Sequence, residues 1–589
     1  MARKVAAIIE RSKCHPDKCQ HECMKYDPVN RSGGEGFHIG PHGKAEIYDE
    51  VVSEIHRISA NKCPFQAIHI VNLPQKLNQD PLNRYGQNAF ELYSLPLIKE
   101  KSIVGVIGRN GIGKSTALNI LSGTLRPNLG NFKSEAKEED IFNYFSKTHL
   151  KDYFKKLFNN KIKIAYKPQR VELIPQIYKG KVIDLLEKHD EKNMGKELLK
   201  ELDLDGIKNK DISKISGGEL QRLAIISCLI RNSDVIYLDE PASFLDITYR
   251  IKVAKLIREF AKDVSTLVVE HDLATLDYIS DEIQVAYGEH ACYGIFSQSK
   301  SVRRGINEYL DGYLPDENIR FRDYKINFMI PNIESGKTPV ITSFPEFEKT
   351  YDQFKLKVNR GELKKSQVLA IMGSNALGKT TFLKILAGIE KPDKKKIEAL
   401  PIAYKPQYIN IIDGTIEENL KKLAGPLFNS GWYQQNILEK LNLKPILQNE
   451  IKFLSGGELQ KFYIASTLSK DSKIMAFDEP SAFIDTEDRL KVAEVIKEFT
   501  LKKEVSTIVV DHDIQLIDYI ADSMLVFEGI PGKEGRMIGP LTKKEGMNRV
   551  LKNLDITYRK DKATFRPRIN KPHSQLDEQQ RKDREYYLC

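Results

Sequence analysis

The chain has 589 residues and a formal net charge of +10, and its length exceeds what one hydrophobic core usually organises, so about two to four domains are expected. With 41% hydrophobic and 29% charged residues it has the composition of an ordinary folded protein. No stretch approaches the roughly 20 apolar residues that cross a bilayer, and the apolar run before Glu10 is too short for a secretory signal. We therefore expect a cytoplasmic protein that is not itself a transporter.

The positive charge favours an RNA-rich partner or an anionic membrane surface. The sequence contains no basic amphipathic helix long enough to prefer the membrane, so we expect no membrane partner.

Four of the seven cysteines lie near the amino terminus, namely Cys14, Cys19, Cys23 and Cys63. An odd number of cysteines in a chain without a secretory signal argues against a disulfide framework and for a metal or cluster at this end. Cys228 lies in the apolar run LAIISCLI and is expected to fill a core.

A first set of ATP-handling motifs follows. It comprises GRNGIGKS (Gly108–Ser115), YKPQ ending at Gln169, SGGELQR from Ser216, VIYLDEP ending at Pro241, and VVEHD with His271. Apolar, β-branched runs typical of buried strands alternate with helical stretches, which predicts an α/β domain. The three clearest strands are Ser102–Gly108, Asp234–Glu240 and Ser265–His271.

A second set repeats the first in the same order. It comprises GSNALGKT (Gly373–Thr380), YKPQ ending at Gln407, SGGELQK from Ser455, IMAFDEP ending at Pro480, and VVDHD with His512. One phosphate-loop pattern alone is a moderate signal. Ten elements in matching order are very hard to obtain by chance, so two tandem ATPase domains are predicted.

The first copy carries an insertion. Ser216 to Asp239 and Ser455 to Asp478 are both 23 positions apart, whereas Lys114 to Gln169 spans 55 positions and Lys379 to Gln407 spans 28, a difference of 27. The extra residues fall around Glu138–Asn160, where the apolar spacing predicts two short amphipathic helices. We interpret this hairpin as a docking element rather than core.

Two segments occupy parallel positions after the ATPase domains, Gly305–Arg322 and Met547–Ile569. Both mix Arg, Tyr and Asn with little periodicity. We expect extended segments that bridge the domains.

The glycine-rich turns direct backbone N–H groups toward one point at the positive end of a helix dipole, which suits phosphate oxygens. Their lysines should reach the β- and γ-phosphates. Magnesium should be held by Ser115, Gln169, Asp239, Thr380, Gln407 and Asp478. The full set expected to bind ATP is Tyr85, Gly108, Asn110, Gly111, Gly113, Lys114, Ser115, Thr116, Gln169, Ser216, Gly217, Gly218, Asp239, Tyr351, Gly373, Asn375, Gly378, Lys379, Thr380, Thr381, Gln407, Ser455, Gly456, Gly457 and Asp478.

The expected catalytic residues are Glu240, Glu479, His271 and His512. Each glutamate follows the metal-binding aspartate and is placed to polarise the attacking water. Each histidine is expected to bond the γ-phosphate and orient that water, the alternative being a structural residue at a strand end. Ala376 stands where the first loop has Gly111; if that position needs positive φ, alanine costs about 1 kcal/mol and the two sites are unequal.

Adenine needs an aromatic face near each phosphate loop. RYGQNAF (Arg84–Phe90) and TYDQF (Thr350–Phe354) lie upstream of the two loops and offer such faces. Tyr85 and Tyr351 are the stacking candidates. Packing of these two rings in the core is the alternative.

SGGEL is similar to the signature of ABC ATPases. In that superfamily the serine and glycines of one domain cap the γ-phosphate held by the other. The resemblance therefore implies one site that pairs Lys114 with Ser455 and another that pairs Lys379 with Ser216. The segments Ser243–Asp246 and Ala482–Asp485 resemble the D-loops that couple such sites. ATP would hold the two halves together and its hydrolysis would release them.

Cys14-x4-Cys19-x3-Cys23, followed by Cys63-Pro64, resembles a ferredoxin-like domain placed before twin ABC cassettes. Together with NRSGGEGFHI from Asn30, INEYLDGYLPDENIRFR and RPRIN, it makes the entire chain similar to the ABC-E subfamily, the ribosome-recycling ATPases also called RNase L inhibitors. This resemblance implies a monomer that splits ribosomes after termination or stalling and binds the small subunit and its rRNA in the ATP-closed state. Implied partners are release-factor-like proteins and initiation factors, and the hairpin and both bridging segments would contact the small subunit.

The chain departs from that family in its cysteines. The family has eight cysteines and two [4Fe–4S] clusters, whereas the fourth position of the first motif is Asp27 here and three positions of the second are Ser53, His56 and Ser59. In two-cluster ferredoxins the cysteine before proline ligates the other cluster. The resemblance therefore implies that Cys14, Cys19, Cys23 and Cys63 hold one [4Fe–4S] cluster and that the other lobe is empty or repacked. A zinc site on the same four cysteines and no metal are the alternatives.

The predicted fold is α/β, with two tandem ABC domains after a small α+β ferredoxin-like domain. The expected domains are residues 1–75 (ferredoxin-like), 76–300 (first ABC domain, hairpin about 133–160), 301–335 (hinge), 336–545 (second ABC domain) and 546–589 (hinge and tail). Three other functions stay open: another ABC translation or RNA factor such as the F subfamily, a nucleotide-dependent binding protein with a different client, and the ATPase subunit of a membrane importer.

Overall fold

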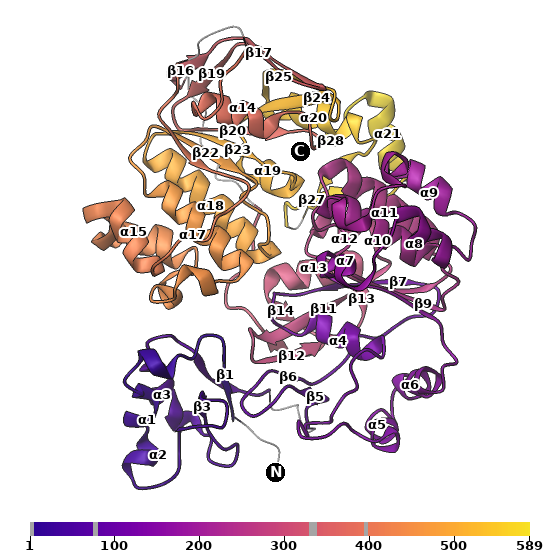
Figure 1. Cartoon of the computed structure of the whole chain (residues 1–589), viewed down its shortest axis with the longest axis vertical. Helices are drawn as coiled ribbons and strands as arrows, with labels where there is room; N and C mark the ends of the chain where they lie inside the picture. Colours follow the sequence, from indigo (N-terminus) through magenta and orange to yellow (C-terminus); the bar gives the residue numbers. More distant parts are fainter. Residues whose placement is uncertain (1–4, 75–79, 329–337, 394–397, 563, 589) are drawn as a thin grey trace. The chain divides into compact units, whose positions relative to one another are not determined.

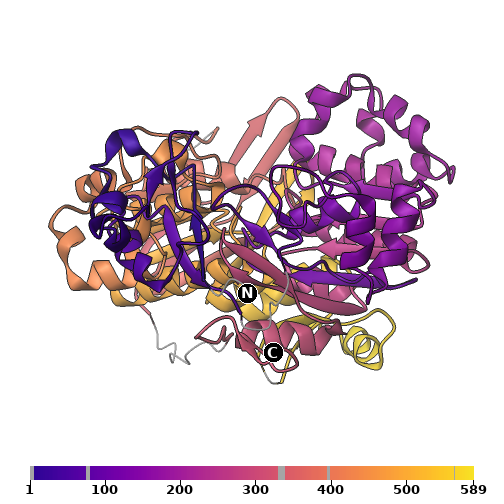
Figure 2. The ribbon, with the colours of Figure 1, turned by 90° about the horizontal axis from the view of Figure 1, so that it is seen from below.

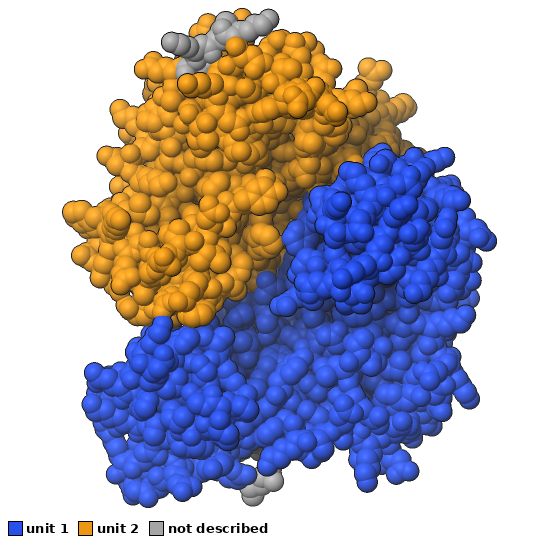
Figure 3. Space-filling view, in the orientation of Figure 1, with its two compact units in different colours: residues 1–245, 252–325 blue, residues 246–251, 326–589 orange. Residues whose placement is uncertain are grey.

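The computed structural model describes residues 5–74, 80–328, 338–393, 398–562 and 564–588. The chain forms two compact units (Figure 3): unit 1 is Met1–Leu245 with Lys252–Lys325, and unit 2 is Asp246–Ile251 with Ile326–Cys589. The finer division into five domains stays a prediction, and its limits at 75/76 and 335/336 lie outside the described residues. Within the described ranges, no helix has the length and apolar character of a membrane span.

The amino-terminal part of unit 1 is a small cluster of short elements, drawn in indigo in Figure 2. Strand β1 (Val5–Ile9) pairs antiparallel with β4 (Ile68–Asn72). Between them lie α1 (Glu22–Lys25), α2 (Pro28–Arg31), β2 (His38–Ile39), β3 (Ala45–Glu46) and α3 (Arg57–Asn61). Their core is small, with Ala7, Phe37 and Ile47 at its centre and Cys14 and Cys23 at its margin.

The rest of unit 1 is built on one mixed sheet with the strand order β5-β6-β12-β11-β7-β10-β9-β8, and β13 pairs with β11. The strands are β5 (Asn83–Arg84), β6 (Glu91–Leu92), β7 (Ile103–Ile107), β8 (Ile164–Lys167), β9 (Val235–Asp239), β10 (Ser265–Val269), β11 (Glu282–Glu289), β12 (Tyr293–Phe296) and β13 (Lys300–Ser301). The three expected strands are confirmed as β7, β9 and β10. They run parallel, so their carboxyl ends meet at one edge, where α/β sheets bind ligands.

Helices flank this sheet (Figure 1). They are α4 (Lys114–Leu121), α7 (Ile174–Ile177), α8 (Val182–His189), α9 (Gly195–Glu201), α10 (Gly217–Leu229), α11 (Ile247–Ala261) and α12 (Leu273–Ile279). Helix α4 follows β7 through the glycine-rich turn, and α10 begins in the signature sequence. The predicted ATP residues thus lie at helix starts and strand ends.

The inserted hairpin forms the two predicted helices, α5 (Glu138–Tyr144) and α6 (Leu150–Phe158). Its apolar face is buried, however: Ile141, Phe145, Leu150 and Phe154 belong to the same core cluster as the sheet strands. The hairpin is therefore part of the core, and the expectation that it lies outside the core is wrong. Only its polar side is left for docking.

Unit 2 repeats this architecture with the strand order β17-β18-β25-β24-β20-β23-β22-β21. The strands are β17 (Phe347–Tyr351), β18 (Phe354–Val358), β20 (Gln367–Met372), β21 (Ile402–Lys405), β22 (Ile474–Asp478), β23 (Ser506–Val510), β24 (Ser523–Ile530) and β25 (Glu534–Thr542); β16 (Val340–Phe344) and β19 (Gly361–Lys364) form a separate pair. The helices are α14 (Lys379–Leu386), α15 (Ile416–Ala424), α16 (Gly431–Tyr433), α17 (Gly456–Leu468), α18 (Thr486–Lys502) and α19 (Ile514–Ile520).

The two bridging segments are not extended throughout, which corrects the prediction. The first enters through α13 (Val302–Asp311) before β14 (Tyr313–Leu314) and β15 (Ile319–Arg320). The second enters through α20 (Lys543–Asn553) before β26 (Tyr558–Lys560), β27 (Pro567–Ile569), α21 (Gln575–Asp583) and β28 (Tyr587–Leu588). Each helix buries apolar residues spaced three and four apart, which stabilises it by packing: Ile306, Tyr309 and Leu310 in α13, and Met547, Val550 and Leu551 in α20.

Candidate functional site: two nucleotide sites and a cysteine pocket

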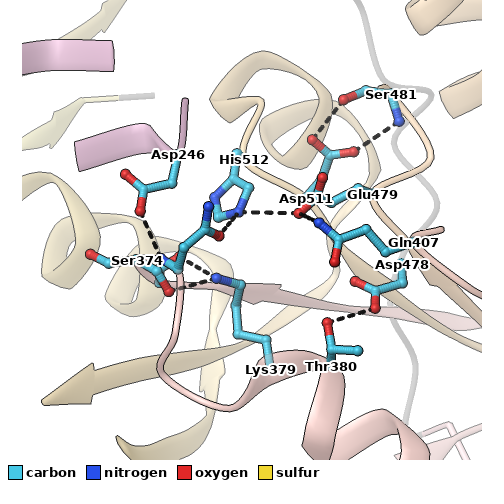
Figure 4. Close-up of polar contacts among 12 residues, drawn as sticks. Asp246, Ser374, Lys379, Thr380, Gln407, Asp478, Glu479, Ser481, Asp511 and His512 are labelled. Carbon is cyan, nitrogen blue, oxygen red and sulfur yellow. Dashed lines mark hydrogen bonds and ion pairs between the residues drawn. The ribbon is translucent and has the colours of Figure 1, made fainter. Parts of the chain in front are cut away.

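Each phosphate loop is closed by its own lysine. Lys114 Nζ donates to the carbonyls of Gly108 (2.9 Å) and Arg109 (2.6 Å). In unit 2, Lys379 Nζ donates to the carbonyls of Gly373 (2.8 Å) and Ser374 (2.6 Å), and Figure 4 shows Lys379 beside Ser374. Both lysines are buried, and they head helices whose free N–H groups are suited to phosphate oxygens.

The fourth residue of each phosphate loop has positive φ, so Ala376 does occupy a position where alanine is strained. Gly111 has φ 74° and Ala376 has φ 57°. The two residues also accept equivalent backbone hydrogen bonds, from Ala291 and from Gly532, both at 3.0 Å. A Cβ on Gly111 would lie 2.6 Å from His290 Nδ1. The first loop therefore requires glycine, and the second carries an alanine in a strained conformation.

The two aspartates expected to face magnesium differ in their hydrogen bonds. Asp478 Oδ2 accepts from Thr380 Oγ1 (2.8 Å) and from the Tyr404 hydroxyl (3.2 Å), whereas neither oxygen of Asp239 makes a hydrogen bond of normal geometry with a described residue. Burial raises the pKa of Asp239 to about 6, and the nearby Ser115 hydroxyl offsets only part of that rise. Burial also raises the pKa of Asp478.

Buried carboxylate oxygens without donors need a cation, and the hydroxyl, carboxylate and amide donors of these sites are the hard oxygen ligands that Mg²⁺ prefers. The residues present therefore fit magnesium at both sites.

The expected catalytic glutamates stand in the left-handed region, both with φ 49°. Their N–H groups donate to Val269 O and Val510 O at 2.8 Å. A non-glycine residue keeps this conformation only where its surroundings enforce it, as happens at active sites. The strain is thus the same in both copies and lies at the residue expected to face the attacking water.

Each glutamate is surrounded by donors. Gln169 Nε2 donates to Glu240 Oε1 at 2.7 Å, and Gln407 Nε2 donates to Glu479 Oε1 at 2.8 Å. His271 Nε2 lies 3.5 Å from Glu240 Oε1, and His512 Nε2 lies 3.5 Å from Glu479 Oε1. Burial raises the pKa of each glutamate, but its histidine and phosphate-loop lysine outweigh burial and hold the pKa at about 2. Both carboxylates are ionised at neutral pH.

Sequence reasoning missed two residues in each cassette that hold the backbone at the end of the strand carrying the aspartate expected to bind magnesium. Lys167 Nζ donates to Asp239 O (2.6 Å) and Glu240 O (3.1 Å), and Lys405 Nζ donates to Asp478 O (2.8 Å) and Glu479 O (3.2 Å). Gln221 Nε2 and Gln460 Nε2 donate to the same glutamate carbonyls at 2.7 and 2.6 Å. The signal was present, because YKPQ and SGGELQ repeat the lysine and the second glutamine in both copies.

A short segment counted with unit 2 reaches the second phosphate loop. Asn375 N donates to Asp246 Oδ2 at 2.7 Å, and the hydroxyls of Thr248 and Ser374 lie 2.8 Å apart. Figure 4 shows Asp246 beside Ser374 and Lys379. Burial lowers the pKa of Lys379 to about 8, and Asp246 partly offsets that fall.

The two tyrosines proposed for adenine are exposed, which disagrees with packing in the core: Tyr85 is 54% exposed and Tyr351 is 41% exposed. The Tyr85 hydroxyl lies 3.1 Å from Thr116 Oγ1 on the phosphate-loop helix. Tyr351 hydrogen-bonds Glu390. Both rings are therefore accessible to a base beside the phosphate loops.

Each signature sequence forms the N-terminus of a helix, and this N-terminus is polar and exposed to solvent. Ser216 and Ser455 are the N-cap residues of α10 and α17, and each hydroxyl donates to a glutamate three residues on (Glu219 and Glu458, both 2.7 Å). The following glycines, Gly217 and Gly456, are exposed. Each helix thus presents N–H groups and a serine at its positive end, which favours an anion.

The four amino-terminal cysteines line one pocket, together with His15, Pro16, Phe65 and Ile68. Backbone N–H groups point at two of the sulfurs, Ala45 N at Cys14 Sγ and Ala67 N at Cys63 Sγ, both at 3.5 Å. Burial, together with the neighbouring cysteines, raises the pKa of Cys23 to about 12. Four thiolates here would need a cationic group, which fits an iron–sulfur cluster. Within the described ranges, no three His, Cys, Asp or Glu side chains are grouped to hold a single metal ion.

Comparison with known proteins gives the same architecture. The family described as "ABC transporter" matches residues 97–243 and 356–482, and "Possible Fer4-like domain in RNase L inhibitor, RLI" matches residues 6–35. Translation initiation factor RLI1 of Saccharomyces cerevisiae is 39% identical over 99% of this chain and 98% of its own length. An uncharacterized ABC transporter ATP-binding protein of Methanocaldococcus jannaschii is 45% identical over 99% of this chain and 97% of its own length.

Two solved structures are similar over most or all of the chain. In "Model of ribosome-bound archaeal Pelota and ABCE1", one chain is 44% identical with a TM-score of 0.92, and the match covers both chains completely. In a complex of the archaeal ribosomal stalk protein aP1 with the archaeal ribosome recycling factor aABCE1, one chain is 46% identical with a TM-score of 0.84, over 87% of this chain and 100% of that one. With its twin ATPase cassettes and amino-terminal cysteine domain, the chain belongs to the ABC-E (RNase L inhibitor) family of ABC ATPases.

Proposed function

We propose that this chain is an ATP-driven ribosome recycling factor, which splits ribosomes into subunits after termination or stalling and binds the small subunit in its ATP-closed state. The observation that carries the proposal is that one chain of this family brings together two matching sets of the residues expected to hydrolyse ATP. In both, a phosphate-binding lysine, a buried aspartate, a strained glutamate and a histidine lie together. Relatives named as a recycling factor and as ribosome-bound support the ribosome as the client.

ATP would act as the bond between the cassettes. The γ-phosphate held by Lys114 would be capped by Ser455 and its glycines, and that held by Lys379 by Ser216. A triphosphate favours the closed state because only that state supplies the second set of donors. Loss of the γ-phosphate removes this preference, so hydrolysis would release the cassettes and drive the next opening.

Within each site the chain's own residues divide the work. Magnesium, when bound, neutralises phosphate charge and would be held by Ser115, Gln169 and Asp239 in one site and by their counterparts Thr380, Gln407 and Asp478 in the other. Glu240 and Glu479 are ionised and would accept a proton or a hydrogen bond from the attacking water. His271 and His512 would orient that water and the γ-phosphate. The backbone N–H groups of each glycine loop would hold the β-phosphate in line.

The small subunit and its rRNA, a release-factor-like protein and initiation factors are the proposed partners. A ribosome-bound pair with Pelota and a complex with a stalk protein are known for relatives, and other relatives are named initiation factors. The exposed lysines of the α5–α6 hairpin, Lys147, Lys155 and Lys156, are suited to RNA phosphates.

The test is co-sedimentation with purified small ribosomal subunits. Wild-type protein should bind with a non-hydrolysable ATP analogue, and Glu240→Gln/Glu479→Gln should bind as firmly with ATP alone. A Lys114→Ala/Lys379→Ala variant is the control and should bind in neither state, because its loops cannot hold the phosphates. Absence of binding under every nucleotide condition would exclude the small subunit as the client. Membrane fractionation with and without ATP tests the importer alternative.

We also propose one [4Fe–4S] cluster on Cys14, Cys19, Cys23 and Cys63. It is supported by the shared pocket and by the N–H groups directed at two of its sulfurs. Iron, sulfide and zinc should be measured on protein purified without air, with Cys63→Ser as the control that loses the metal. Stoichiometric zinc without iron would replace the cluster with the alternative of a zinc ion on the four cysteines.

A further inference from the structure

Beside the cysteine pocket, the amino-terminal part of unit 1 contains a polar cluster with a buried centre. It consists of Asp27, Ser53, His56 and Ser59, which we call the polar lobe. Asp27, His56 and Ser59 are 0% exposed, whereas Ser53 lies at its exposed edge. These residues stand where the resemblance to two-cluster relatives expects cysteines. The structure therefore shows what a chain without those ligands places at the second position.

The carboxylate of Asp27 is anchored on both oxygens. Oδ1 accepts the N–H of Val29 at 3.1 Å, which caps α2, and Oδ2 accepts the N–H of Phe37 at 2.7 Å. The backbone is closed tightly around it, because a Cβ on Gly36 would lie 1.8 Å from Oδ2. Both oxygens are thus already committed to the protein's own backbone.

The imidazole of His56 continues this arrangement. Its Nδ1 lies 3.1 Å from Ser53 N, 3.3 Å from Ser53 Oγ and 3.2 Å from Ser53 O. Nε2 lies 3.6 Å from Asp27 Oδ1. The ring also packs edge-on against Phe37, with centroids 5.9 Å apart. Ser53, His56, Asp27 and Phe37 therefore form one continuous polar and aromatic chain through the lobe.

The lobe does not fit an iron–sulfur cluster. Such a cluster takes its ligands from thiolates, with histidine as an occasional replacement, and the lobe supplies one carboxylate, one imidazole and two hydroxyls. The two carboxylate oxygens and Nδ1 are already acceptors of backbone N–H groups. The His56 ring and the Phe37 ring lie against each other in the interior.

We infer that the second lobe carries no cluster and that the Asp27–His56 pair replaces it as a metal-free core. The expected iron content rests on the proposed cluster at the four cysteines; the rest of the inference does not. Counted together with its four thiolate ligands, a [4Fe–4S] cluster is an anionic group that accepts N–H hydrogen bonds through its sulfurs. The Asp27 carboxylate supplies the same kind of acceptor to Val29 and Phe37, and the Nε2 side of His56 faces it. The amino-terminal domain can therefore keep both lobes folded with half of the iron.

The first measurement is the metal content of the full chain purified without air and reconstituted with iron and sulfide. We expect about four iron and four sulfide per chain, the content of one [4Fe–4S] cluster. After reduction, electron paramagnetic resonance should show one isolated cluster without coupling to a second. About eight iron per chain, or a coupled spectrum, would overturn the inference.

The second measurement follows the polar lobe itself. Asp27→Ala and His56→Ala should leave the iron content unchanged, whereas Cys23→Ser should lose it. Hydrogen–deuterium exchange of peptides that contain Phe37 should rise in Asp27→Ala, because that amide loses its acceptor. Glu35→Ala, which removes an exposed carboxylate of the same segment, is the control and should leave exchange unchanged.

The outcomes separate the two proposals. Loss of iron in Asp27→Ala or His56→Ala would make these residues ligands and overturn the inference, as would unchanged exchange at Phe37. If the wild type binds no iron at all, the cluster on the four cysteines fails, while increased exchange in Asp27→Ala still supports the polar lobe as a metal-free core.

Discussion

The two cassettes share their motifs and strand order but differ in what surrounds the metal-binding aspartate. In the second, Tyr404 and Thr380 both donate to Asp478. In the first, the equivalent Tyr166 hydroxyl donates instead to Asn119 Oδ1 at 3.1 Å. The counterpart of Asn119 is Lys384, which offers no acceptor. The residue at this position of the phosphate-loop helix thus differs together with the direction of the tyrosine hydroxyl, and Asp239 receives no hydrogen bond from Tyr166.

The hairpin adds a second difference, because it reaches the metal-binding strand of the first cassette. The Tyr153 hydroxyl of α6 lies 2.6 Å from the Tyr237 hydroxyl of β9 and donates to Leu121 O of α4 at 2.5 Å. The counterpart of Tyr237 is Ala476. Among the described residues, the first cassette therefore has a hydroxyl pair between its inserted hairpin and the strand that ends at Asp239, and alanine stands at the matching strand position of the second. The same motifs can accordingly serve two sites that respond differently to their surroundings.

The largest effect should come from the glutamates, and it tests whether the cassettes are equal. Glu240→Gln and Glu479→Gln keep the size of the side chain but replace one carboxylate oxygen with an NH2 group and remove the proton acceptor, so the double variant should lose about 10²-fold or more of ATPase activity. Steady-state ATPase and bound-nucleotide analysis measure it. Unequal single variants would identify the rate-limiting site, and Glu187→Gln on exposed surface is the control. A double variant with wild-type activity would remove both glutamates from catalysis.

Removal of the hairpin's hydroxyl comes next. Tyr153→Phe leaves Leu121 O without this donor and Tyr237 without its partner in a buried place, which should cost about 1–3 kcal/mol of stability. Tyr237→Phe should cost less, because Tyr153 keeps Leu121 O. Differential scanning calorimetry of the full chain measures both variants. If Tyr237→Phe lowers stability as much as Tyr153→Phe or more, the hydrogen bond from Tyr153 to Leu121 O contributes no more than the one between the two tyrosines.

The phosphate loops allow a reciprocal exchange. Gly111→Ala places a Cβ at positive φ and 2.6 Å from His290 Nδ1, so it should destabilise by more than the roughly 1 kcal/mol expected from backbone strain alone. Ala376→Gly relieves strain but makes the unfolded chain more flexible, so its gain should stay below about 1 kcal/mol. Thermal unfolding with and without ATP measures both. Comparable effects of opposite sign would mean that His290 moves aside freely.

Much of the nucleotide sites could be predicted from sequence, because each motif joins a residue type to a fixed place on a strand or helix. Repetition strengthened that prediction: β7, β9 and β10 lie where apolar runs placed them. What sequence could not give are contacts between residues far apart, such as Tyr153 with Tyr237, which are 84 positions apart. Such pairs leave no periodic signal.

The bridging segments show a different limit. Their many polar residues hid short amphipathic helices, α13 and α20, whose apolar face is only three or four side chains wide. Helices of this kind are stabilised by tertiary packing more than by propensity. The hairpin was correctly predicted as two helices, yet its role in the core depends on which surface receives its phenylalanines. Periodicity gives an apolar face but not its partner.

The smallest expected effect concerns a hydroxyl that only the first glutamate has. Ser243 Oγ donates to Glu240 Oε2 at 2.8 Å, whereas the counterpart in the second cassette is Ala482 and the adjacent Ser481 donates instead to Asp511 at 2.8 Å. Ser243→Ala would free one carboxylate oxygen for the attacking water. Since Gln169 and His271 remain beside Glu240, the rate should rise, by less than about tenfold.

This difference can be isolated by ATPase measurements in the Glu479→Gln background, where turnover reports mainly on the first site. Ala482→Ser in the Glu240→Gln background is the matched exchange and should slow the second site, because it adds the donor that the first site has. A loss with Ser243→Ala as large as that with Glu240→Gln would mean that the hydroxyl itself positions the water. The two glutamates would then work in different ways, although both have φ 49° and a pKa lowered to about 2.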